Sequence, residues 1–390
     1  MSVVEETVAE EFDKVRRGIK YPRDRKAQCR ENSKVRLPND MVVVSADSHW
    51  SLTEDIFYKR FPDHLKHKAP RLVPDASGVT NWFVDGRPLI PEVAFEGFAT
   101  FERVPGSSQI EPRLRDLDLE GVNKEIVFGN AIGSGLGDPD TESREHIFRI
   151  YNEHLAEMQA KAPGRFHGVG LINYWDMSKV RASIMQLKSM GLKTYMLPQH
   201  PKGAGSVALD YCDPSMEPLW AAAAEADLPL CFHTGEFFKG GPGGWGTSMM
   251  IQFGPFRKNL AELIFGGIFD RYPNLQVVFA EADINWIPGA LQHASMAYTC
   301  FNPMLTPAIK HNPRYYWQHN CYATFMHDPV GLRMLDQIGA DRVMWSHDYP
   351  HPESVYGFGW DAMQSVIDAT TEEQARMILG GTAMKVFKLD

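Results

Sequence analysis

The stretch VVVSADSHW at 42–50 places two chemically competent side chains directly after an apolar run. Alternate residues of an extended chain point to the same side, so Asp47 and His49 are expected to project together. A carboxylate and an imidazole on one face can bind a metal ion. The alternative is a turn residue followed by a surface histidine, and the tripeptide alone does not decide between the two.

Three further apolar runs end in residues of the same kind. His233 ends LPLCFH, Glu281 ends LQVVFAE, and His347 and Asp348 follow RVMWS. Any one of them could be a satisfied polar residue of the core, but four such runs in one chain favour a shared site. Carboxylates and imidazoles without thiolates suit zinc, manganese or iron. Such an ion polarises a substrate oxygen or lowers the pKa of a bound water.

Strand-like apolar runs alternate with longer amphipathic segments between residues 41 and 346, which is typical of βα units on a parallel sheet. We predict a (β/α)8 TIM-like barrel, with a doubly wound open sheet as the alternative. In a barrel the carboxyl ends of the strands form the active-site mouth, which is where the residues above would lie. The expected strands are 41–46, 124–129, 166–172, 193–197, 228–233, 275–281, 321–326 and 342–346, and two of the expected helices are 142–163 and 214–227.

Two segments fall outside this repeat. Residues 1–40 are polar and punctuated by proline, which predicts an N-terminal arm that wraps another subunit or lies on the surface of the barrel formed by 41–390. The segment at about 51–123 is too long for one βα crossover, and its FVDGRPLI at 83–90 carries a hairpin signal. We therefore expect an insertion after the first strand that helps to close the site.

Composition limits the class of protein. The 390 residues carry a net charge of -9, which argues against a nucleic-acid partner. There is no apolar run of membrane-spanning length and the charged start lacks the apolar core of a secretory signal. The five cysteines are scattered without C-x-x-C spacing, as expected in a reducing compartment. We predict a cytoplasmic protein with a small-molecule substrate and no membrane partner.

The chain resembles the amidohydrolase-related family, the branch of the amidohydrolase superfamily that includes aminocarboxymuconate semialdehyde decarboxylase and the resorcylate decarboxylases. The resemblance covers most of 41–390 and implies the barrel fold, a metal ion held by Asp47, His49, His233 and Asp348, and a second role for Asp348 as proton acceptor. It also implies a dimer or larger assembly, either a homo-oligomer or a pair with a homologous subunit. The matching stretches are ADSH, CFHTG, YPNLQVVFAEADINWIP, IGADRVMWSHDYPHPES and GGTAMKVFKLD.

The sequence departs from that family at two positions. Glu281 stands where many relatives have a histidine, and His347 stands where they often have a serine. Together with His200 in YMLPQHPKG, these residues predict a possible second metal position, with Glu281 bridging two ions. The alternative is that His200 and His347 only contact substrate or the carboxylates that support the ligands.

These observations favour a metal-dependent hydrolase of a small organic acid or amide, or a decarboxylase of the same family, with Asp348, Glu281 and His347 as catalytic candidates. The absence of a histidine at position 281 favours hydrolysis over decarboxylation. A dinuclear non-haem iron or manganese-iron oxygenase is the alternative that would use the second ion. The third hypothesis is a non-catalytic subunit that keeps a structural metal.

Four further residues have weaker signals. Arg113 and Arg115 lie in EPRLRDLD, where the helical pattern favours a solvated face over a clamp for a substrate carboxylate. His351 follows Asp348 closely and is expected to support the ligands. Glu236 in HTGE could contact substrate or cap a loop.

Overall fold

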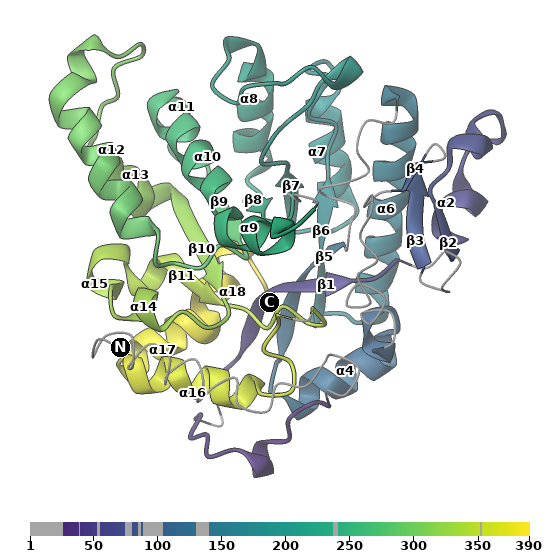
Figure 1. The fold of residues 1–390 in the computed structure, drawn as a ribbon, viewed down its shortest axis with the longest axis vertical. Helices are drawn as coiled ribbons and strands as arrows, with labels where there is room; N and C mark the ends of the chain where they lie inside the picture. Colours follow the sequence, from purple (N-terminus) through teal and green to yellow (C-terminus); the bar gives the residue numbers. More distant parts are fainter. Residues whose placement is uncertain are drawn as a thin grey trace.

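Eight parallel strands form one sheet in the order β1-β5-β6-β7-β8-β9-β10-β11, so each strand pairs with its neighbour along the chain. All eight predicted strands form, and the fold is a (β/α)8 barrel (Figure 1). The computed structural model describes residues 26–38, 40–52, 55–74, 80–84, 87–88, 104–129, 140–236, 241–351 and 353–390. The barrel strands are β1 (Val44–Trp50), β5 (Lys124–Gly129), β6 (Phe166–Leu171), β7 (Thr194–Leu197), β8 (Leu230–His233), β9 (Val277–Ala280), β10 (Cys321–Phe325) and β11 (Val343–Trp345).

Backbone hydrogen bonds join the first and last strands where both reach the mouth. The amide of Asp348 donates to the carbonyl of Asp47 at 2.9 Å, and the amide of His49 donates to the carbonyl of Tyr349 at 2.6 Å. The hydroxyl of Ser45 also accepts from the amide of His347 at 2.8 Å. The segments that contain Asp47 and Asp348 are thus brought side by side, as a barrel requires.

Helices surround the sheet, and the alternation of side chains along each strand separates two apolar layers. Residues such as Tyr195 and Phe232 point outward and pack with the helices, whereas Val169 and Cys231 point into the barrel. The helices are α2 (Asp55–Arg60), α4 (Ile110–Leu119), α6 (Thr141–Lys161), α7 (Val180–Ser189), α8 (Glu217–Ala226), α9 (Gly244–Ile251), α10 (Gly254–Phe265), α11 (Ile268–Arg271), α12 (Ile287–Phe301), α13 (Pro313–Asn320), α14 (Pro329–Leu332), α15 (Leu335–Ile338), α16 (Gly359–Ala369), α17 (Glu372–Arg376), the π-helical turn η9 (Met377–Gly381) and α18 (Thr382–Val386).

Short 3₁₀ turns complete the described secondary structure, and Asp213 caps one of them. Its carboxylate accepts from the amide of Ser215, and the turn leads directly into α8. The 3₁₀ turns are η2 (Arg30–Asn32), η3 (Asp63–Lys68), η4 (Pro105–Ser107), η5 (Ala204–Ser206), η6 (Pro214–Met216), η7 (Asn302–Met304) and η8 (Ala340–Arg342).

The far end of the barrel is closed by the C-terminal residues. Ala383, Val386 and Phe387 join the apolar layer inside the barrel, and Lys124 at the start of β5 donates to the carbonyl of Asp390. Because this end is filled, only the opposite end of the barrel is left to build a site.

The insertion after β1 contains a small antiparallel sheet of β2 (Arg71–Pro74), β3 (Thr80–Val84) and β4 (Arg87–Pro88). The strands β3 and β4 pair as the hairpin signal predicted, with Phe83 opposite Pro88, although the turn at 85–86 lies outside the described residues. The insertion then continues through η4 into α4. That it helps to close the site stays a prediction.

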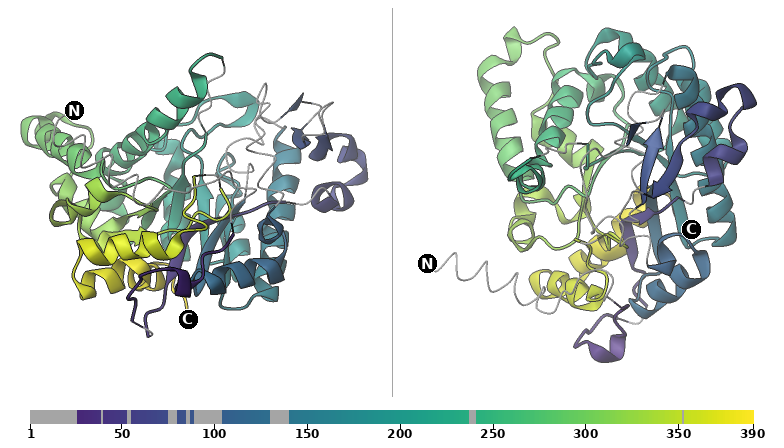
Figure 2. Two further views of the ribbon diagram at one scale, coloured as in Figure 1. Left: turned by 60° about the horizontal axis from the view of Figure 1, so that its bottom comes forward. Right: turned by 45° about the vertical axis from the view of Figure 1, so that its right-hand side comes forward.

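The described part of the N-terminal arm lies on its own barrel. Gln28 accepts from the amide of Trp360 at 3.0 Å, Arg30 lies over the Trp360 ring, and the amide of Arg36 donates to Gln364. Two of these partners belong to α16, beside which the purple N-terminal segment runs in Figure 2. Residues 1–25 of the predicted arm lie outside the described residues.

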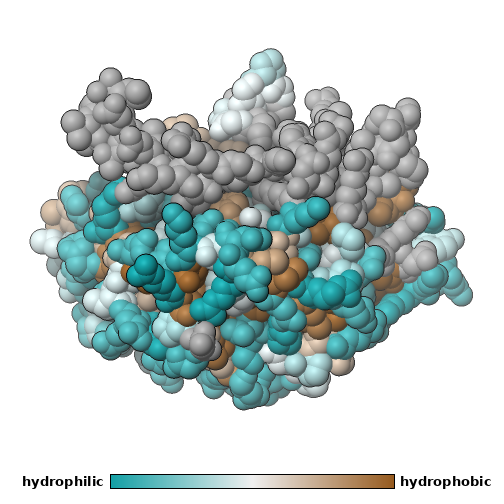
Figure 3. Space-filling model, turned by 90° about the horizontal axis from the view of Figure 1, so that it is seen from below, coloured by the Kyte–Doolittle hydropathy of each residue, from teal (hydrophilic) through white to brown (hydrophobic). Residues whose placement is uncertain are grey.

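The face of the molecule seen in Figure 3 is mostly hydrophilic, with apolar residues scattered over it, as is usual for a globular surface. Within the described residues, no helix combines the length and the apolar character needed to cross a membrane.

Candidate metal centre

The centre begins at β1, where Asp47 and His49 lie side by side as predicted. Oδ1 of Asp47 is 3.5 Å from Nε2 of His49, and both side chains are buried. The strand runs to Trp50 rather than ending at 46, and its pairing with β5 contains a bulge, because Ser45 pairs with Glu125 but Ser48 pairs with Val127. A bulge of one extra residue re-aims the side chains that follow it.

His233 and Glu281 come from the ends of β8 and β9. Nε2 of His233 lies 3.4 Å from Oδ1 of Asp47 and 3.5 Å from Oε2 of Glu281. The other ring nitrogen, Nδ1, donates to the carbonyl of Thr234 at 2.9 Å, which leaves Nε2 free to bind an ion. The ring of Phe128 packs 4.5 Å from the His233 ring and provides an apolar floor.

Asp348 and His351 complete the group from the turn after β11. Oδ1 of Asp348 is 3.1 Å from Nε2 of His49 and 3.1 Å from Nδ1 of His351. The ring of His351 stacks on that of His49 with 3.7 Å between centroids. Side chains about three hundred positions apart in the sequence therefore meet at one rim of the barrel.

The six residues form what we call the metal cluster: Asp47, His49, His233, Glu281, Asp348 and His351. They make two overlapping groups whose candidate ligand atoms lie within 4.8 Å of one another, and His49 and Glu281 belong to both. One oxygen of Asp47, both ring nitrogens of His49 and both oxygens of Asp348 are buried without a hydrogen-bond partner. Buried polar atoms of this kind are normally satisfied, so this arrangement fits a divalent ion.

Electrostatics also favour a cation at the metal cluster. Burial, with the nearby charge of Asp348, raises the pKa of Glu281 well above its usual range. Burial likewise raises the pKa of Asp47 and lowers that of His49 well below its usual range. For Asp348 burial acts in the same direction, but the imidazoles of His351 and His49 together outweigh it and lower the pKa. Three carboxylates in a buried space are stabilised in their charged forms by a divalent ion.

The backbone at the metal cluster is strained in a way that sequence patterns do not reveal. Glu281, Asp283 and Asp348 have φ values of 48°, 49° and 55°, in the left-handed region that side chains seldom adopt. The amide of Glu281 is held by the hydroxyl of Thr324 at 2.8 Å. Such strain persists only where the surroundings fix it, and it concentrates at functional sites.

The two histidines predicted for a second ion lie elsewhere. Nε2 of His347 is 2.6 Å from Oε2 of Glu120, and both side chains are wholly buried. His200 is half exposed, at 49%, and its Nδ1 lies 3.5 Å from Glu236. In the part of the chain that the structure describes, neither belongs to a group of metal-competent atoms. The structure thus corrects the placement of His200 and His347, whereas Glu281 does lie in the metal cluster.

The weaker candidates are also resolved. Arg113 is buried and paired with Glu125, so the prediction of a solvated face is wrong for it, while Arg115 is exposed. Glu236 caps a loop, accepting from the amides of Gln199 and His200. His351 lies among the candidate ligands, and its spacing of three residues from Asp348 is the signal that could have placed it there.

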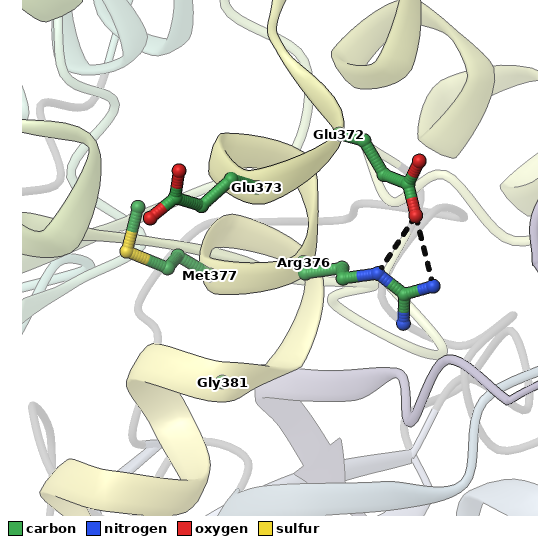
Figure 4. A pocket seen from close by; sticks show the side chains of 5 residues that line it. All are labelled: Glu372, Glu373, Arg376, Met377 and Gly381. Carbon is green, nitrogen blue, oxygen red and sulfur yellow. Dashed lines mark hydrogen bonds and ion pairs between the residues drawn. The ribbon is translucent and has the colours of Figure 1, made fainter.

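A groove of about 430 Å³ lies along α17 and η9 and shares no residue with the metal cluster (Figure 4). Arg376 pairs there with Glu372 at 3.0 Å and with Asp40 at 3.2 Å. The residues that line it are Glu372, Glu373, Arg376, Met377 and Gly381.

Comparison with known proteins supports these features. The model of the amidohydrolase family matches residues 131–389. The 2-amino-3-carboxymuconate-6-semialdehyde decarboxylase of Dictyostelium discoideum is 26% identical over 71% of this chain and 76% of its own length. The gamma-resorcylate decarboxylase of Rhodococcus jostii is 25% identical over 74% of this chain and 93% of its own length.

Solved structures share the fold. An amidohydrolase from Mycobacterium avium subsp. paratuberculosis superposes with a TM-score of 0.74 at 16% identity, covering 90% of this chain and all of its own. A dihydroxybenzoic acid decarboxylase from Polaromonas sp., solved with bound manganese and the inhibitor 2-nitroresorcinol, has a TM-score of 0.63 at 19% identity and covers 90% of this chain and 97% of its own.

Proposed function

The chain belongs to the amidohydrolase family, and on that premise we propose that it is a metal-dependent decarboxylase of a small organic acid. The observation that carries the proposal is Asp348, whose two buried oxygens lack hydrogen-bond partners and face the same cluster as Asp47, His49 and His233. Both curated relatives described above are decarboxylases. The sequence alone favoured hydrolysis because of Glu281, and hydrolysis stays a prediction.

In this proposal Asp47, His49, His233 and Asp348 hold the ion, which when bound orients the substrate oxygens and stabilises negative charge there. Decarboxylation breaks the bond between carbon and the carboxylate, leaves the electron pair on the carbon and replaces carbon dioxide with a proton. Asp348 relays that proton from His351, whose Nδ1 lies 3.1 Å away and whose pKa the Asp348 carboxylate raises to about 9 against the effect of burial, so that His351 carries a proton near neutral pH. Glu281, whose Oε2 lies 4.0 Å from Nε2 of His49, is the second proton carrier.

A second candidate function is oxygenation at two ions. It is favoured by one observation, the division of the metal cluster into two groups that share His49 and Glu281. In that case Asp348 and His351, rather than the predicted His200 and His347, supply the added ligands. The non-catalytic subunit has no such observation in its favour and stays a prediction.

The cellular compartment, the substrate and the assembly of the enzyme are also proposals. All five cysteines are free thiols, which supports work in the reducing cytoplasm. We propose a small-molecule substrate and an assembly that is either a homo-oligomer or a pair with a homologous subunit. Sedimentation of the purified chain, alone and mixed with a homologous partner, tests the assembly.

Protein purified without chelator tests the reaction. We expect one zinc, manganese or iron ion per chain, and release of carbon dioxide from a panel of hydroxybenzoic and unsaturated dicarboxylic acids without consumption of oxygen. Two redox-active ions with oxygen uptake would establish the oxygenase instead. Cleavage of amides or lactones without carbon dioxide release would establish the hydrolase. The Asp348→Asn variant, prepared in the same way, is the background control.

A further inference from the structure

One face of α4 points at the residues that flank Asp348. Arg113, Asp116 and Glu120 are spaced three and four positions apart, so they lie on one side of the helix and its C-cap. We call these three residues the α4 clamp. None of them belongs to the metal cluster, but Glu120 and Asp116 contact the two neighbours of Asp348, and Arg113 contacts the backbone of His49.

Glu120 holds the residue that precedes Asp348. Its Oε2 lies 2.6 Å from Nε2 of His347, and its Oε1 accepts from the amides of Gly357 and Gln28 at 2.7 and 2.6 Å. The packing is close, because a Cβ at Gly359 would lie only 2.4 Å from Oε2 of Glu120. One oxygen of Glu120 therefore holds His347, and the other holds Gln28 of the N-terminal arm and the loop at Gly357.

Asp116 holds the residue that follows Asp348. It accepts from the hydroxyl of Tyr349 at 2.7 Å and from that of Tyr356 at 3.3 Å. Tyr349 is wholly buried, and its own carbonyl accepts from the amide of His49 at 2.6 Å. By holding Tyr349, Asp116 restrains the backbone on both sides: that of Asp348, which is covalently linked to Tyr349, and that of His49, which is hydrogen-bonded to it.

Arg113 holds His49 directly. Its Nη1 donates to the carbonyl of His49 at 2.8 Å, while Nε and Nη2 donate to the two oxygens of Glu125 at 2.6 and 2.8 Å. Its guanidinium also lies 4.9 Å from the centre of the Tyr349 ring. A planar guanidinium can donate to several acceptors at once, and a lysine at this position could not make the paired hydrogen bonds to both oxygens of Glu125.

We propose that the α4 clamp positions His49 and Asp348 within the metal cluster, so that the ion's affinity and geometry depend on residues that never touch it. The inference rests on the proposed metal site. Its physical basis is the left-handed backbone at Asp348, which persists only because both neighbours are fixed. Residues that orient ligands in this way typically change metal affinity by about 10- to 100-fold when replaced.

Cobalt(II) is the probe, because its visible absorption reports the geometry of the ligands. We would titrate cobalt into apoprotein of the wild type, Glu120→Gln and Arg113→Lys, and record circular dichroism and the melting temperature of each. Arg115→Lys is the matched control, since Arg115 lies on the exposed side of the same helix. We expect both clamp variants to bind cobalt about 10-fold or more weakly with altered absorption bands, and the control to match the wild type.

A folded Glu120→Gln variant with the affinity and spectrum of the wild type would overturn the positioning role. Failure of the wild type to bind cobalt would overturn the metal site and this inference together. A weakened, shifted spectrum in an enzyme that releases no carbon dioxide would support the clamp and reject only the decarboxylase. If the two variants unfold, Tyr349→Phe removes a single hydroxyl, and an unchanged spectrum there would contradict the inference.

Discussion

The metal cluster and the region around the α4 clamp meet at residues 347–349, and they differ in how far their buried polar atoms are hydrogen-bonded. Asp348 belongs to the metal cluster, where buried carboxylate and imidazole atoms lack hydrogen-bond partners. Its neighbours His347 and Tyr349 belong to the region around the α4 clamp, where Glu120 accepts from three donors and Arg113 donates to four acceptor atoms. Asp348 is therefore a candidate ligand, whereas the residues before and after it, His347 and Tyr349, have supporting roles.

The difference separates function from support. A buried polar group without a partner costs free energy, so a cluster of them indicates that another group is meant to complete it. A fully paired network is instead rigid and needs nothing further. At His347 it is the pairing of Nε2 with Glu120 that assigns the residue to support, although its Nδ1 is buried without a partner.

Replacing Asp348 tests the comparison with the largest expected effect. Asp348→Asn keeps the volume and removes the charge and the proton-carrying group, so we expect turnover to fall by about 10³-fold, the order seen when a group that acts on the transition state is lost. The apoprotein also loses the buried ionic contacts of Oδ1 with His49 and His351 at 3.1 Å, so we expect its melting temperature to fall modestly while the fold is kept. Wild-type turnover in the folded variant would remove Asp348 from its assigned role.

Adding and removing metal tests the same difference between the metal cluster and the α4 clamp, with the melting temperature as the measurement. An ion that binds only the folded state at a concentration 100 times its Kd stabilises that state by about 2.7 kcal/mol. We therefore expect added manganese to raise the melting temperature of the wild type and chelator to reverse the rise. His233→Ala should respond much less, because it lacks a ligand. Equal rises in both proteins would show that the stabilising ion binds outside the metal cluster.

The sequence was sufficient for the barrel and for most of the cluster. Apolar runs bounded by metal-competent residues placed Asp47, His233 and Asp348 correctly, because the carboxyl ends of parallel strands must meet at one rim. The ranges of the strands needed only shifts of a few residues, the largest at β1, where a bulge extends the strand to Trp50.

What the sequence could not supply was the direction of individual side chains. Arg113 lies in a polar helical segment typical of a solvated face, and only the structure shows that it is buried and paired with Glu125 of β5. His200 and His347 follow strands as ligands would, but Glu236 and Glu120 turn them to other contacts. Such partners are distant in sequence, and no spacing rule connects them.

A smaller effect, on the pH dependence of stability, should arise from His154. This histidine is hydrogen-bonded to Trp50, the residue after His49, and so belongs with the paired residues that support the metal cluster. The indole nitrogen of Trp50 donates to Nε2 of His154 at 3.0 Å, so the imidazole must stay neutral to accept. Burial lowers the pKa of His154 to about 4. Between the unfolded pKa of about 6.5 and this value, the unfolded chain binds a proton that the folded protein does not, and stability falls as the pH falls.

We expect this single group to remove up to about 3 kcal/mol of stability between pH 6.5 and pH 4, from a shift of about 2.5 units at 1.36 kcal/mol each. The His154→Gln variant keeps an acceptor for Trp50 but does not titrate, so urea unfolding over this pH range should show a flatter profile than that of the wild type. His67→Gln, which replaces an exposed histidine, should follow the wild-type profile. Parallel profiles for the wild type and His154→Gln would mean that His154 is not held neutral. The supporting region would then contain a buried charge, and the contrast with the metal cluster would not extend beyond the α4 clamp.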